Sequence, residues 1–438
     1  MSSSTRAGTP LTESYRESVL WSEQVDPVAA GLRDATLEVL PAHADVAVVG
    51  GGYCGLEAAA TLASLGRSVV VLDRHDLGWG ASSRNGGMVI PELKSGPRTL
   101  EANYGSLGLE LHAEVEAAFD HVESLVGDGG IDCDYERSGQ LYVTHGRRGA
   151  ARLEALAQEL TSVGGAARYV EGQDLVAEVG SRLFAAGVVI DRTGGLHPAK
   201  FHAGLVARAR AAGAVLAPHT AASSVQRASG AGHVVHTERG NLHADHVLLA
   251  TNAYADGLDP TLRRRVLPMD SFVIATEPLS AEVAASVLPT RRMTFNDRNL
   301  LWYWRHGPDG RLLFGGRKRL GHVSLTEARD HLYESMLTAH PQLVGTRVDR
   351  VWGGKVALTL DRLPHCGRVD GLWYATGCNG SGVALNTWMG RRMAEAICGA
   401  ELPAFAGLSH RPIPAHSMRD GWLPAVGEWF RVQDALGR

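Results

Sequence analysis

The sequence predicts a mixed α/β (α+β) fold, in which a second, sheet-based domain is inserted into a Rossmann-like βαβ domain. Two observations carry this prediction. Over residues 45–73, an apolar run is followed by three closely spaced glycines, a helix-forming segment and a second apolar run that ends in aspartate. A similar order of apolar run, glycine-rich turn and helix-forming segment returns over residues 372–399. Together they predict a Rossmann-like domain whose parts are separated along the chain.

The βαβ unit can be followed segment by segment. Residues 45–49 (DVAVV) are a short apolar run, which is typical of a strand buried in a parallel sheet. Residues 53–65 are good helix formers, with several alanines small enough for close packing on a sheet. Residues 68–73 (SVVVLD) predict a second buried strand with an acidic residue at its end.

Gly50, Gly52 and Gly55 match the pattern G-x-G-x-x-G between the first strand and the helix. The first glycine permits a tight turn, the second lets the backbone approach a pyrophosphate, and the third allows close contact between helix and strand. The N-terminus of the helix presents N–H groups and partial positive charge to the phosphates. Asp73 is placed to accept hydrogen bonds from ribose hydroxyls. This ordered set predicts a dinucleotide-binding site.

The segment after Asp73 indicates the kind of dinucleotide. A nicotinamide-binding domain would continue into another helix, whereas a Gly/Ser loop over residues 78–87 follows here almost at once. Such a loop offers further backbone donors, which suits a larger cofactor with an isoalloxazine ring.

Composition limits the other functions. The chain has 438 residues, 45% of them hydrophobic, and a net charge of -4, so two or three domains are expected and a nucleic acid is not a predicted partner. The sequence has no run of about eighteen apolar residues, so no membrane span is predicted. The five cysteines are scattered without metal or redox spacing, which favours a reduced, cytoplasmic setting and no metal site. Lysine occurs only four times in this arginine-rich chain, at Lys94, Lys200, Lys318 and Lys355.

Residues 298–322 predict a β-hairpin with a Gly-Pro-Asp-Gly turn. Because side chains alternate along a strand, Trp302 and Trp304 share one face, and Tyr303 and Arg305 share the other. One face is expected to lie over the cofactor, and the alternative is that these aromatic residues are sheet core.

Three segments carry a resemblance to a known family: VVGGGYCGLEAA (48–59), GWGASSRNGG (78–87) and GCNGSGVALN (377–386). They resemble the D-amino-acid-oxidase-type flavoprotein superfamily, and among its members the gamma-glutamylputrescine oxidase-like branch. The resemblance covers nearly all of the chain after the N-terminal arm. It implies an FAD between a nucleotide-binding domain and a sheet-based substrate domain, and oxidation of a C–N bond of an unspecified substrate.

The same resemblance implies roles for individual residues. The C-terminal glycine turn would bring the N-terminus of a helix to the N1–C2=O edge of the flavin. The residues expected to bind FAD are Gly50, Gly52, Tyr53, Cys54, Gly55, Asp73, Arg74, Gly80, Ala81, Ser82, Arg84, Asn85, Gly86, Gly87, Ala222, Thr251, Gly377, Gly380, Ser381, Gly382, Val383 and Ala384.

The residues expected in the substrate pocket are Met88, Trp302, Tyr303, Arg305 and Trp352. Lys318 and Lys355 are candidate catalytic residues that would assist oxygen through their positive charge, with solvated strand ends as the alternative. Some relatives attach FAD covalently through a histidine in the loop after the acidic residue, and others through a cysteine near residue 359. The loop segment SSRNGG (82–87) has no histidine and the residues just before Thr359 include no cysteine, so non-covalent FAD is expected.

The expected domain boundaries follow from these segments. Residues 1–44 are an N-terminal arm, and the FAD-binding domain comprises residues 45–98, 184–265 and 350–438. The substrate-binding domain comprises residues 99–183 and 266–349.

The expected activity is hydride transfer from a neutral amine to flavin N5, with hydrolysis of the resulting imine and reoxidation of the flavin by O2. The amine could be polyamine-derived, a secondary amine or an amino acid. Three alternatives stay open: an amino-acid dehydrogenase of the same fold that passes electrons to a quinone or carrier, a flavin-binding protein without turnover, and a nicotinamide-dependent dehydrogenase.

Overall fold

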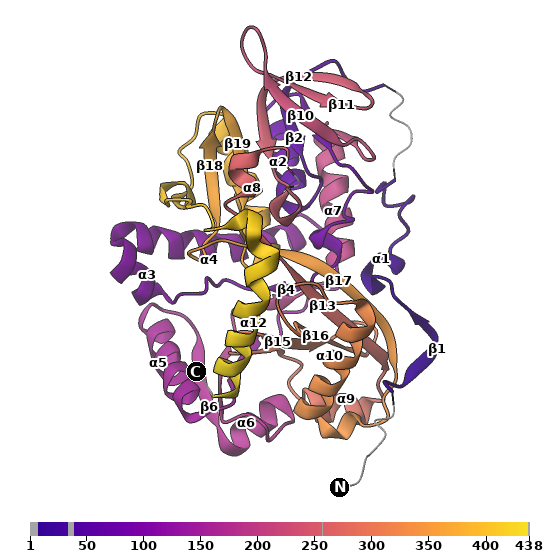
Figure 1. Ribbon diagram of the computed structural model, residues 1–438, viewed down its shortest axis with the longest axis vertical. Helices are drawn as coiled ribbons and strands as arrows, with labels where there is room; N and C mark the ends of the chain where they lie inside the picture. Colours follow the sequence, from indigo (N-terminus) through magenta and orange to yellow (C-terminus); the bar gives the residue numbers. More distant parts are fainter. Residues whose placement is uncertain (1–7, 34–38, 256, 437–438) are drawn as a thin grey trace.

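The computed structural model describes residues 8–33, 39–255 and 257–436 of the chain, and it confirms the mixed α/β fold. Two large sheets organise this part of the chain, one in the upper and one in the lower half of Figure 1. No helix in the part of the chain that the structure describes is long and apolar enough to cross a membrane.

The upper sheet has eight strands within the described residues. Its main path is β10 (Ala222–Arg227), β11 (His233–Thr237), β12 (Gly240–Leu249), β2 (His43–Val49), β3 (Val69–Leu72) and β9 (Val215–Ala217), and β19 (Leu372–Thr376) joins β12 to β18 (His365–Val369). The strands β9, β3, β2, β12 and β19 run parallel. The predicted βαβ unit is therefore confirmed as β2, α2 (Tyr53–Ser64) and β3.

Both faces of β2 are covered, which explains why its sequence is apolar without alternation. Val46 and Val48 pack in the cluster that contains α2, α7 (Pro198–Ala211) and α11 (Gly382–Ile397). Ala47 and Val49 face the opposite cluster, which includes residues of β11 and β12. The helices α11 and α2 approach closely because residue 390 is glycine; a Cβ there would overlap the carbonyl oxygen of Cys54.

The lower sheet has nine strands within the described residues. Their order is β1 (Leu11–Arg16), β17 (Val348–Leu358), β13 (Leu267–Pro278), β16 (Arg311–Gly316), β15 (Trp302–His306), β14 (Met293–Asn296), β5 (Gln140–Thr144), β7 (Ala186–Ile190) and β6 (Ala167–Glu171). The predicted hairpin is confirmed as β15 and β16, which pair antiparallel with Trp304 opposite Phe314.

The two faces of this sheet have different roles. Trp302 and Trp304 pack with Phe314 in the core beneath α10 (Leu325–Ala339). The other face carries Tyr303 and Trp352, which lie with Leu20 and Trp21 of the N-terminal arm and with Ala199 of α7. This second face is turned toward the eight-stranded sheet, so it is the face that can contribute to a site between the two sheets.

Two strands that were predicted to belong to the FAD-binding domain pair in the nine-stranded sheet instead. The strand β7 lies within the segment 184–265, predicted to be FAD-binding, yet it pairs with β5 and β6 in the nine-stranded sheet. Residues 350–358 of β17 also pair in that sheet, with β13. A buried strand has the same apolar pattern in either sheet, so the sequence pattern does not reveal which partner it takes.

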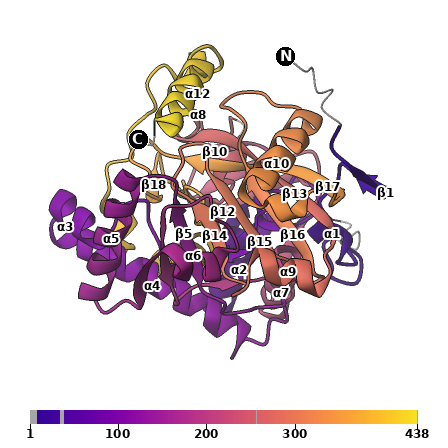
Figure 2. The ribbon, with the colours of Figure 1, turned by 90° about the horizontal axis from the view of Figure 1, so that it is seen from below.

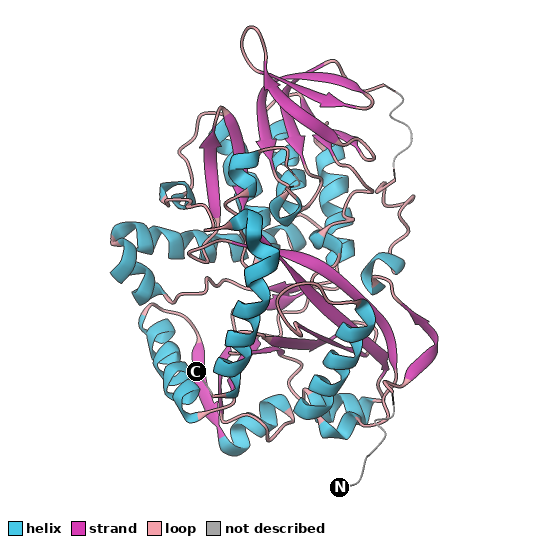
Figure 3. Cartoon of the chain, in the orientation of Figure 1, coloured by secondary structure: helices cyan, strands magenta, loops and turns pink. Residues whose placement is uncertain are grey.

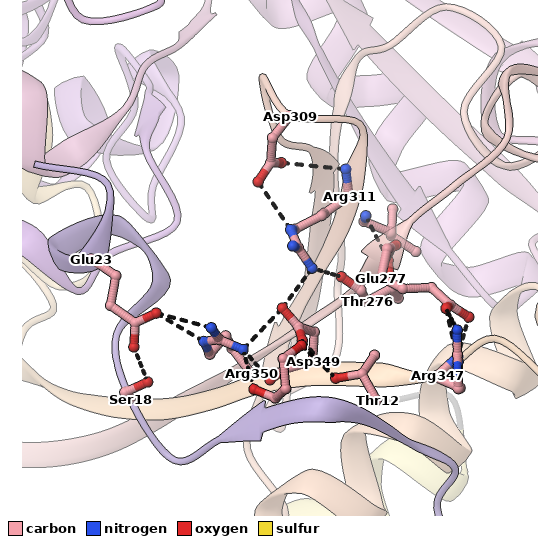
Figure 4. A network of polar contacts seen from close by, with 12 residues as sticks. Thr12, Ser18, Glu23, Thr276, Glu277, Asp309, Arg311, Arg347, Asp349 and Arg350 are labelled. Carbon is pink, nitrogen blue, oxygen red and sulfur yellow. Dashed lines mark hydrogen bonds and ion pairs between the residues drawn. The ribbon is translucent and has the colours of Figure 1, made fainter.

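The N-terminal arm extends the nine-stranded sheet, because β1 pairs parallel with β17. Figure 4 shows the polar network that fixes it. Asp349 on β17 is 2% exposed and accepts hydrogen bonds from Thr12 Oγ1 at 2.6 Å and Ser14 Oγ at 2.7 Å. Arg311 donates to the same carboxylate at 2.7 Å, and Arg350 reaches from it to Glu23. A buried carboxylate with this many donors holds the arm in a defined place.

The remaining elements surround the two sheets. They are the short pair β4 (Met88–Val89) and β8 (Gly194–Gly195), and the helices α1 (Leu20–Glu23), α3 (Pro97–Tyr104), α4 (Ser106–Val126), α5 (Arg147–Ser162), α6 (Gly172–Val179), α8 (Pro260–Arg263), α9 (Ala281–Val287) and α12 (Arg419–Ala435). Figure 2 shows α3, α4 and α5 on one side of the molecule and α1 and β1 on the other. Figure 3 shows the helices distributed around both sheets.

Five histidines make the fold sensitive to acid. Burial lowers their pKa from 6.5 to about 4 or about 3: His145, His197, His202, His340 and His410. Between pH 6.5 and pH 4 the unfolded chain binds protons that the folded chain does not. The contribution of these neutral histidines to the free energy of unfolding is therefore complete above pH 6.5, and it is lost as the pH drops toward 4.

We expect the melting temperature to fall steeply between pH 6.5 and pH 4, and His340→Phe to reduce this slope. His340 is fully buried and stacks edge-on against Trp304, so phenylalanine fills much of the same space without titrating. Thermal melts at several pH values measure the slope, with exposed His322→Asn as the control. An unchanged slope in His340→Phe would contradict the assignment.

Candidate active site

A cavity of about 290 Å³ lies where β2, β3 and β12 end. These strands are parallel, and ligands of such sheets bind at the carboxyl ends of the strands. Eleven of the residues predicted to bind the cofactor line the cavity: Gly50, Gly52, Tyr53, Cys54, Asp73, Arg74, Gly80, Ala81, Ser82, Ala222 and Thr251. The cavity therefore brings together segments that are about two hundred residues apart in the sequence.

The glycine turn forms one wall of this cavity. A Cβ at residue 55 would overlap the carbonyl oxygen of Gly50, so the turn and the start of α2 can approach this closely only with glycine there. A Cβ at residue 52 would lie 2.9 Å from Ser82 Oγ, the atom that accepts a hydrogen bond from Tyr53 N at 3.1 Å. No side chain caps the N-terminus of α2. An anion such as a pyrophosphate can therefore take that place.

Asp73 forms the acidic end of the cavity. Its carboxylate accepts hydrogen bonds from Gly51 N at 2.8 Å and from His75 N at 3.0 Å. Burial raises the pKa of this carboxyl group, while the two backbone donors act in the opposite direction. A buried carboxylate with remaining lone pairs needs further donors, and the hydroxyl groups of a ribose supply them.

Two aromatic residues that the sequence analysis did not single out also line the cavity. The rings of Trp79 and Tyr254 meet edge to face with their centroids 6.0 Å apart, and the guanidinium of Arg84 lies 4.6 Å from the Trp79 ring centroid. Trp79 precedes Gly80 within the predicted loop, and Tyr254 lies three residues after Thr251, a residue expected to bind FAD. Their position in the sequence beside predicted cofactor residues was the signal that could have identified them.

The loop 78–87 is held by side chains from distant elements. Trp352 Nε1 donates to the carbonyl oxygen of Arg84 at 2.9 Å, and Trp21 Nε1 donates to that of Asn85 at 2.9 Å. Arg305 Nη1 donates to the carbonyl oxygen of Gly87 at 3.0 Å. Trp352 and Arg305, both predicted to line the substrate pocket, thus contact the backbone of the loop. Any contact that they make with substrate stays a prediction.

Tyr303 continues the site beyond the cavity. Its hydroxyl lies 3.3 Å from Ser271 Oγ, and a Cβ at residue 86 would lie 3.1 Å from its ring. Met88 follows directly after the loop and is partly exposed, whereas Trp302 packs in the core on the opposite face of the sheet. Among these predicted pocket residues, Tyr303 and Met88 therefore lie on the side of the loop.

The second glycine turn lies at the start of α11. Gly377 has a φ of 79°, and a Cβ there would overlap the methyl group of Thr359. Asn379 accepts a hydrogen bond from Thr359 N at 3.1 Å, which joins the turn to the end of β17. The first turn of α11 begins at Gly382, and no side chain caps its N-terminus. This helix end is therefore open to an electron-rich group.

The remaining predicted cofactor residues do not line the cavity. Gly55 lies behind the phosphate turn, Arg84 to Gly87 form the loop backbone described above, and the residues of the second turn lie around the N-terminus of α11: Gly377, Gly380, Ser381, Gly382, Val383 and Ala384. Their contact with the cofactor stays a prediction.

The two lysines predicted to be catalytic each make an ion pair. Lys318 Nζ lies 3.4 Å from Glu327 at the start of α10. Lys355 Nζ lies 2.8 Å from Asp270, and Lys355 lines the cavity close to Tyr254. The structure does not bring the two lysines to a common point, and their role with oxygen stays a prediction.

A charged cluster that the sequence analysis missed lies beside the second turn. Burial raises the pKa of Glu92 to about 7, and Gln140 Nε2 donates a hydrogen bond to its carboxylate. Burial lowers the pKa of Lys94, with Glu92 acting in the opposite direction and Arg317 and Arg362 adding to the shift. Lys94 was noted only as one of four lysines; Arg317 and Arg362 come from distant segments, so their approach to it could not be read from the sequence.

The residues that are present fit a flavin dinucleotide. A glycine turn at a helix N-terminus, a buried carboxylate with lone pairs to spare and a cavity between the two are the groups that bind pyrophosphate and ribose. A second open helix end, at α11, lies on the side of the nine-stranded sheet.

The arrangement defines a dinucleotide-binding protein with a Rossmann-like domain. A family model described as "DAO: FAD dependent oxidoreductase" matches residues 45–396, and the chain belongs to this family. FAD is therefore its cofactor, as the sequence predicted, and its non-covalent attachment agrees with what is typical of the family.

Comparison with individual proteins agrees. The chain is 33% identical over 405 residues to gamma-glutamylputrescine oxidoreductase of Escherichia coli, covering 90% of this chain and 93% of the relative, which confirms the predicted branch. Two solved structures share the fold. Glycine oxidase of Geobacillus kaustophilus has a TM-score of 0.71 at 22% identity, covering 85% of this chain and 100% of that one. L-proline dehydrogenase of P. horikoshii has a TM-score of 0.70 at 18% identity, covering 83% and 96%.

We expect Asp73→Ala to weaken FAD binding by about 1.5–3 kcal/mol, the scale of a hydrogen bond to a charged group. Gly52→Val should weaken it more, because a branched side chain would take the space beside Ser82 that the phosphates need. Titration of the apoprotein with FAD, followed by flavin fluorescence, measures both. The control is Asp76→Ala, because Asp76 lies three residues after Asp73 and pairs with Arg33 and His219. Full FAD occupancy in Gly52→Val would refute the nucleotide site.

Proposed function

We propose that the protein oxidises a C–N bond of an amine with FAD as the electron acceptor, and that O2 reoxidises the reduced cofactor. One observation carries the proposal. The cofactor cavity is lined by Gly78 to Ser82, and the same loop meets the ring of Tyr303 of the nine-stranded sheet at Gly86. A small substrate held between a redox cofactor and such a sheet face is kept away from water. The E. coli relative named after gamma-glutamylputrescine supports an amine as the substrate.

The chain's own residues orient the reactants. FAD, when bound, supplies the redox chemistry by accepting a hydride from the carbon next to the substrate nitrogen. The loop 78–87, held at three carbonyl groups, and Tyr303 above Gly86 fix the floor on which the substrate lies. The N-terminus of α11 stabilises negative charge that develops beside it. Because a neutral amine can release a hydride without a protein base, no catalytic carboxylate is required.

We expect an amine that bleaches the bound flavin in the absence of air to consume O2 and release one equivalent of H2O2 per turnover in air. An oxygen electrode and a peroxidase-coupled assay measure the two quantities on the same sample. Fast reoxidation by a quinone combined with slow reoxidation by O2 would favour the dehydrogenase alternative. Failure of a broad panel of amines and amino acids to bleach the flavin would contradict the proposed function as a whole.

A role of Lys318 or Lys355 with oxygen predicts a selective kinetic effect. Lys318→Met or Lys355→Met should slow reoxidation of the flavin by roughly tenfold or more, about 1.4 kcal/mol, because the positive charge that stabilises superoxide is lost. Reduction by the amine should change less. Stopped-flow measurements separate the two half-reactions. Unchanged reoxidation in both variants would leave these lysines as partners of Glu327 and Asp270.

A further inference from the structure

The C-terminal helix α12 has two apolar faces, and within the described residues only one of them is covered by protein. Leu423 and Gly427 are the buried residues of the covered face. A Cβ at residue 427 would lie 3.1 Å from the backbone nitrogen of Leu320, so the helix lies close against the protein there. Asp434 accepts a hydrogen bond from Leu300 N at 3.0 Å. These contacts fix α12 in one orientation and therefore fix the direction of its outer face.

The outer face of α12 carries a row of apolar side chains. Met418, which precedes the helix, is 70% exposed, Trp429 is 59% exposed, and Leu436, which follows the helix, is 61% exposed. Figures 1 and 2 both show α12 on the outside of the molecule. The row, which we call the α12 stripe, consists of Met418, Trp422, Ala425, Trp429, Val432 and Leu436, of which Trp422 is partly buried and the others are exposed. A contiguous row of this kind indicates a surface that another molecule covers.

The spacing of the α12 stripe indicates what that molecule is. Its members follow one another at intervals of four, three, four, three and four residues. This spacing gives a narrow seam along one side of a helix, which is the geometry of two helices packed along their length. A wider apolar face, of about 100° or more, is expected where a helix is buried in a core or in a lipid surface. The stripe therefore fits a second helix.

The stripe is complementary to a second copy of itself in the antiparallel direction. About a twofold axis at the level of Gly427, residues that lie equally far before and after this position face each other. Ala425 then faces Trp429 of the second copy, so the smallest side chain of the stripe lies opposite one of its largest. In a parallel pair each residue would meet its own counterpart, which crowds the seam at Trp429 and leaves it empty at Ala425. The other pairs across the axis are Met418 with Leu436 and Trp422 with Val432.

The charges at the two ends of α12 also favour the antiparallel direction. At its first turn, Arg419 Nη1 lies 3.2 Å from His416 Nε2. Burial lowers the pKa of this histidine, and the charges of Arg419, Arg263 and Arg264 lower it further, so all three guanidinium groups lie near it. The other end carries Asp434 and the last carbonyl groups of the helix, which are partially negative. An antiparallel pair places each arginine cluster beside the negative end of the other helix, whereas a parallel pair brings the two clusters together.

We propose that a second copy of this chain covers the α12 stripe, with the two α12 helices packed antiparallel about a twofold axis near Gly427. Such a dimer goes beyond the proposed function and does not depend on which amine is oxidised. A helix of 17 residues is about 25 Å long, so the helix pair by itself buries less than the roughly 1,600 Å² of a standard interface. The dimer is therefore weak, and its population rises with the protein concentration.

Sedimentation of the FAD-loaded enzyme over roughly 1 to 100 µM measures this concentration dependence. We expect the average mass of the wild type to rise from the 46.7 kDa of one chain toward twice that value. Trp429→Glu places a charge in the seam and should raise the dissociation constant of the dimer by roughly a hundredfold or more. The matched control is Val344→Glu, because Val344 is 74% exposed on another part of the surface, and it should behave like the wild type. Both variants should keep the bound flavin, since neither side chain is buried.

Cysteine pairs test the direction of the two helices. In a background with Cys398→Ser, which removes the partly exposed cysteine, Met418→Cys and Leu436→Cys are made singly and together. Oxidised glutathione is the oxidant that accepts the two electrons released when two thiols join. The antiparallel pair brings residue 418 of one copy to residue 436 of the other, so the double variant should form a covalent dimer and each single variant should not. Adding Trp429→Glu to the double variant should abolish the crosslink.

Several results would overturn the proposed dimer. One is a wild type that stays monomeric over the whole concentration range, and another is a dimer that Trp429→Glu leaves unchanged. Disulfide formation by the single variants would indicate a parallel pair and refute the antiparallel arrangement. A monomeric wild type that binds phosphatidylglycerol vesicles, while Trp429→Glu does not, would identify a lipid surface as the occupant of the stripe.

Discussion

The arrangement of the active site depends on how the loop 78–87 is held between the two sheets. The carbonyl oxygens of Arg84, Asn85 and Gly87 accept hydrogen bonds from side chains far away in the sequence. The donors are, in that order, Trp352 of β17, Trp21 of the arm and Arg305 of β15. A buried carbonyl group that loses its partner costs about 1–3 kcal/mol, so these contacts determine one position for the loop. That position fixes both the mouth of the FAD cavity at Gly80 and the start of the segment that carries Lys94.

The choice of donors follows from their surroundings. An indole has one N–H donor and a large apolar ring, so Trp21 and Trp352 can satisfy a carbonyl group while their rings fill the core between the arm and the sheet. Arg305 reaches two carbonyl groups, of Gly87 and Leu196, each at 3.0 Å. Burial lowers its pKa only to about 10, so it remains charged at neutral pH. The N-terminal arm is therefore part of the site's support, and the network at Asp349 anchors it.

The sequence was informative where structure is local. The unit β2–α2–β3, the hairpin of β15 and β16 and the turn before α11 each follow from neighbouring residues, because periodicity and glycine spacing act over a few positions. It was uninformative where partners are distant. Nothing near Trp21 indicates its bond to Asn85, 64 residues away, and nothing near Lys94 indicates Arg317. The membership of β7 and β17 was missed for the same reason, since an apolar strand fits either sheet.

The site is electrostatically polarised along its length. At the nucleotide end, Asp73 is a buried carboxylate that favours hydrogen-bond donors, while the uncapped start of α2 favours phosphate. At the other end, the uncapped start of α11 favours acceptors and anions. A helix end acts only over its first turn, so each of these preferences is local. The chain therefore offers two separate helix ends to electron-rich groups, one beside the glycine turn and one beside the second turn.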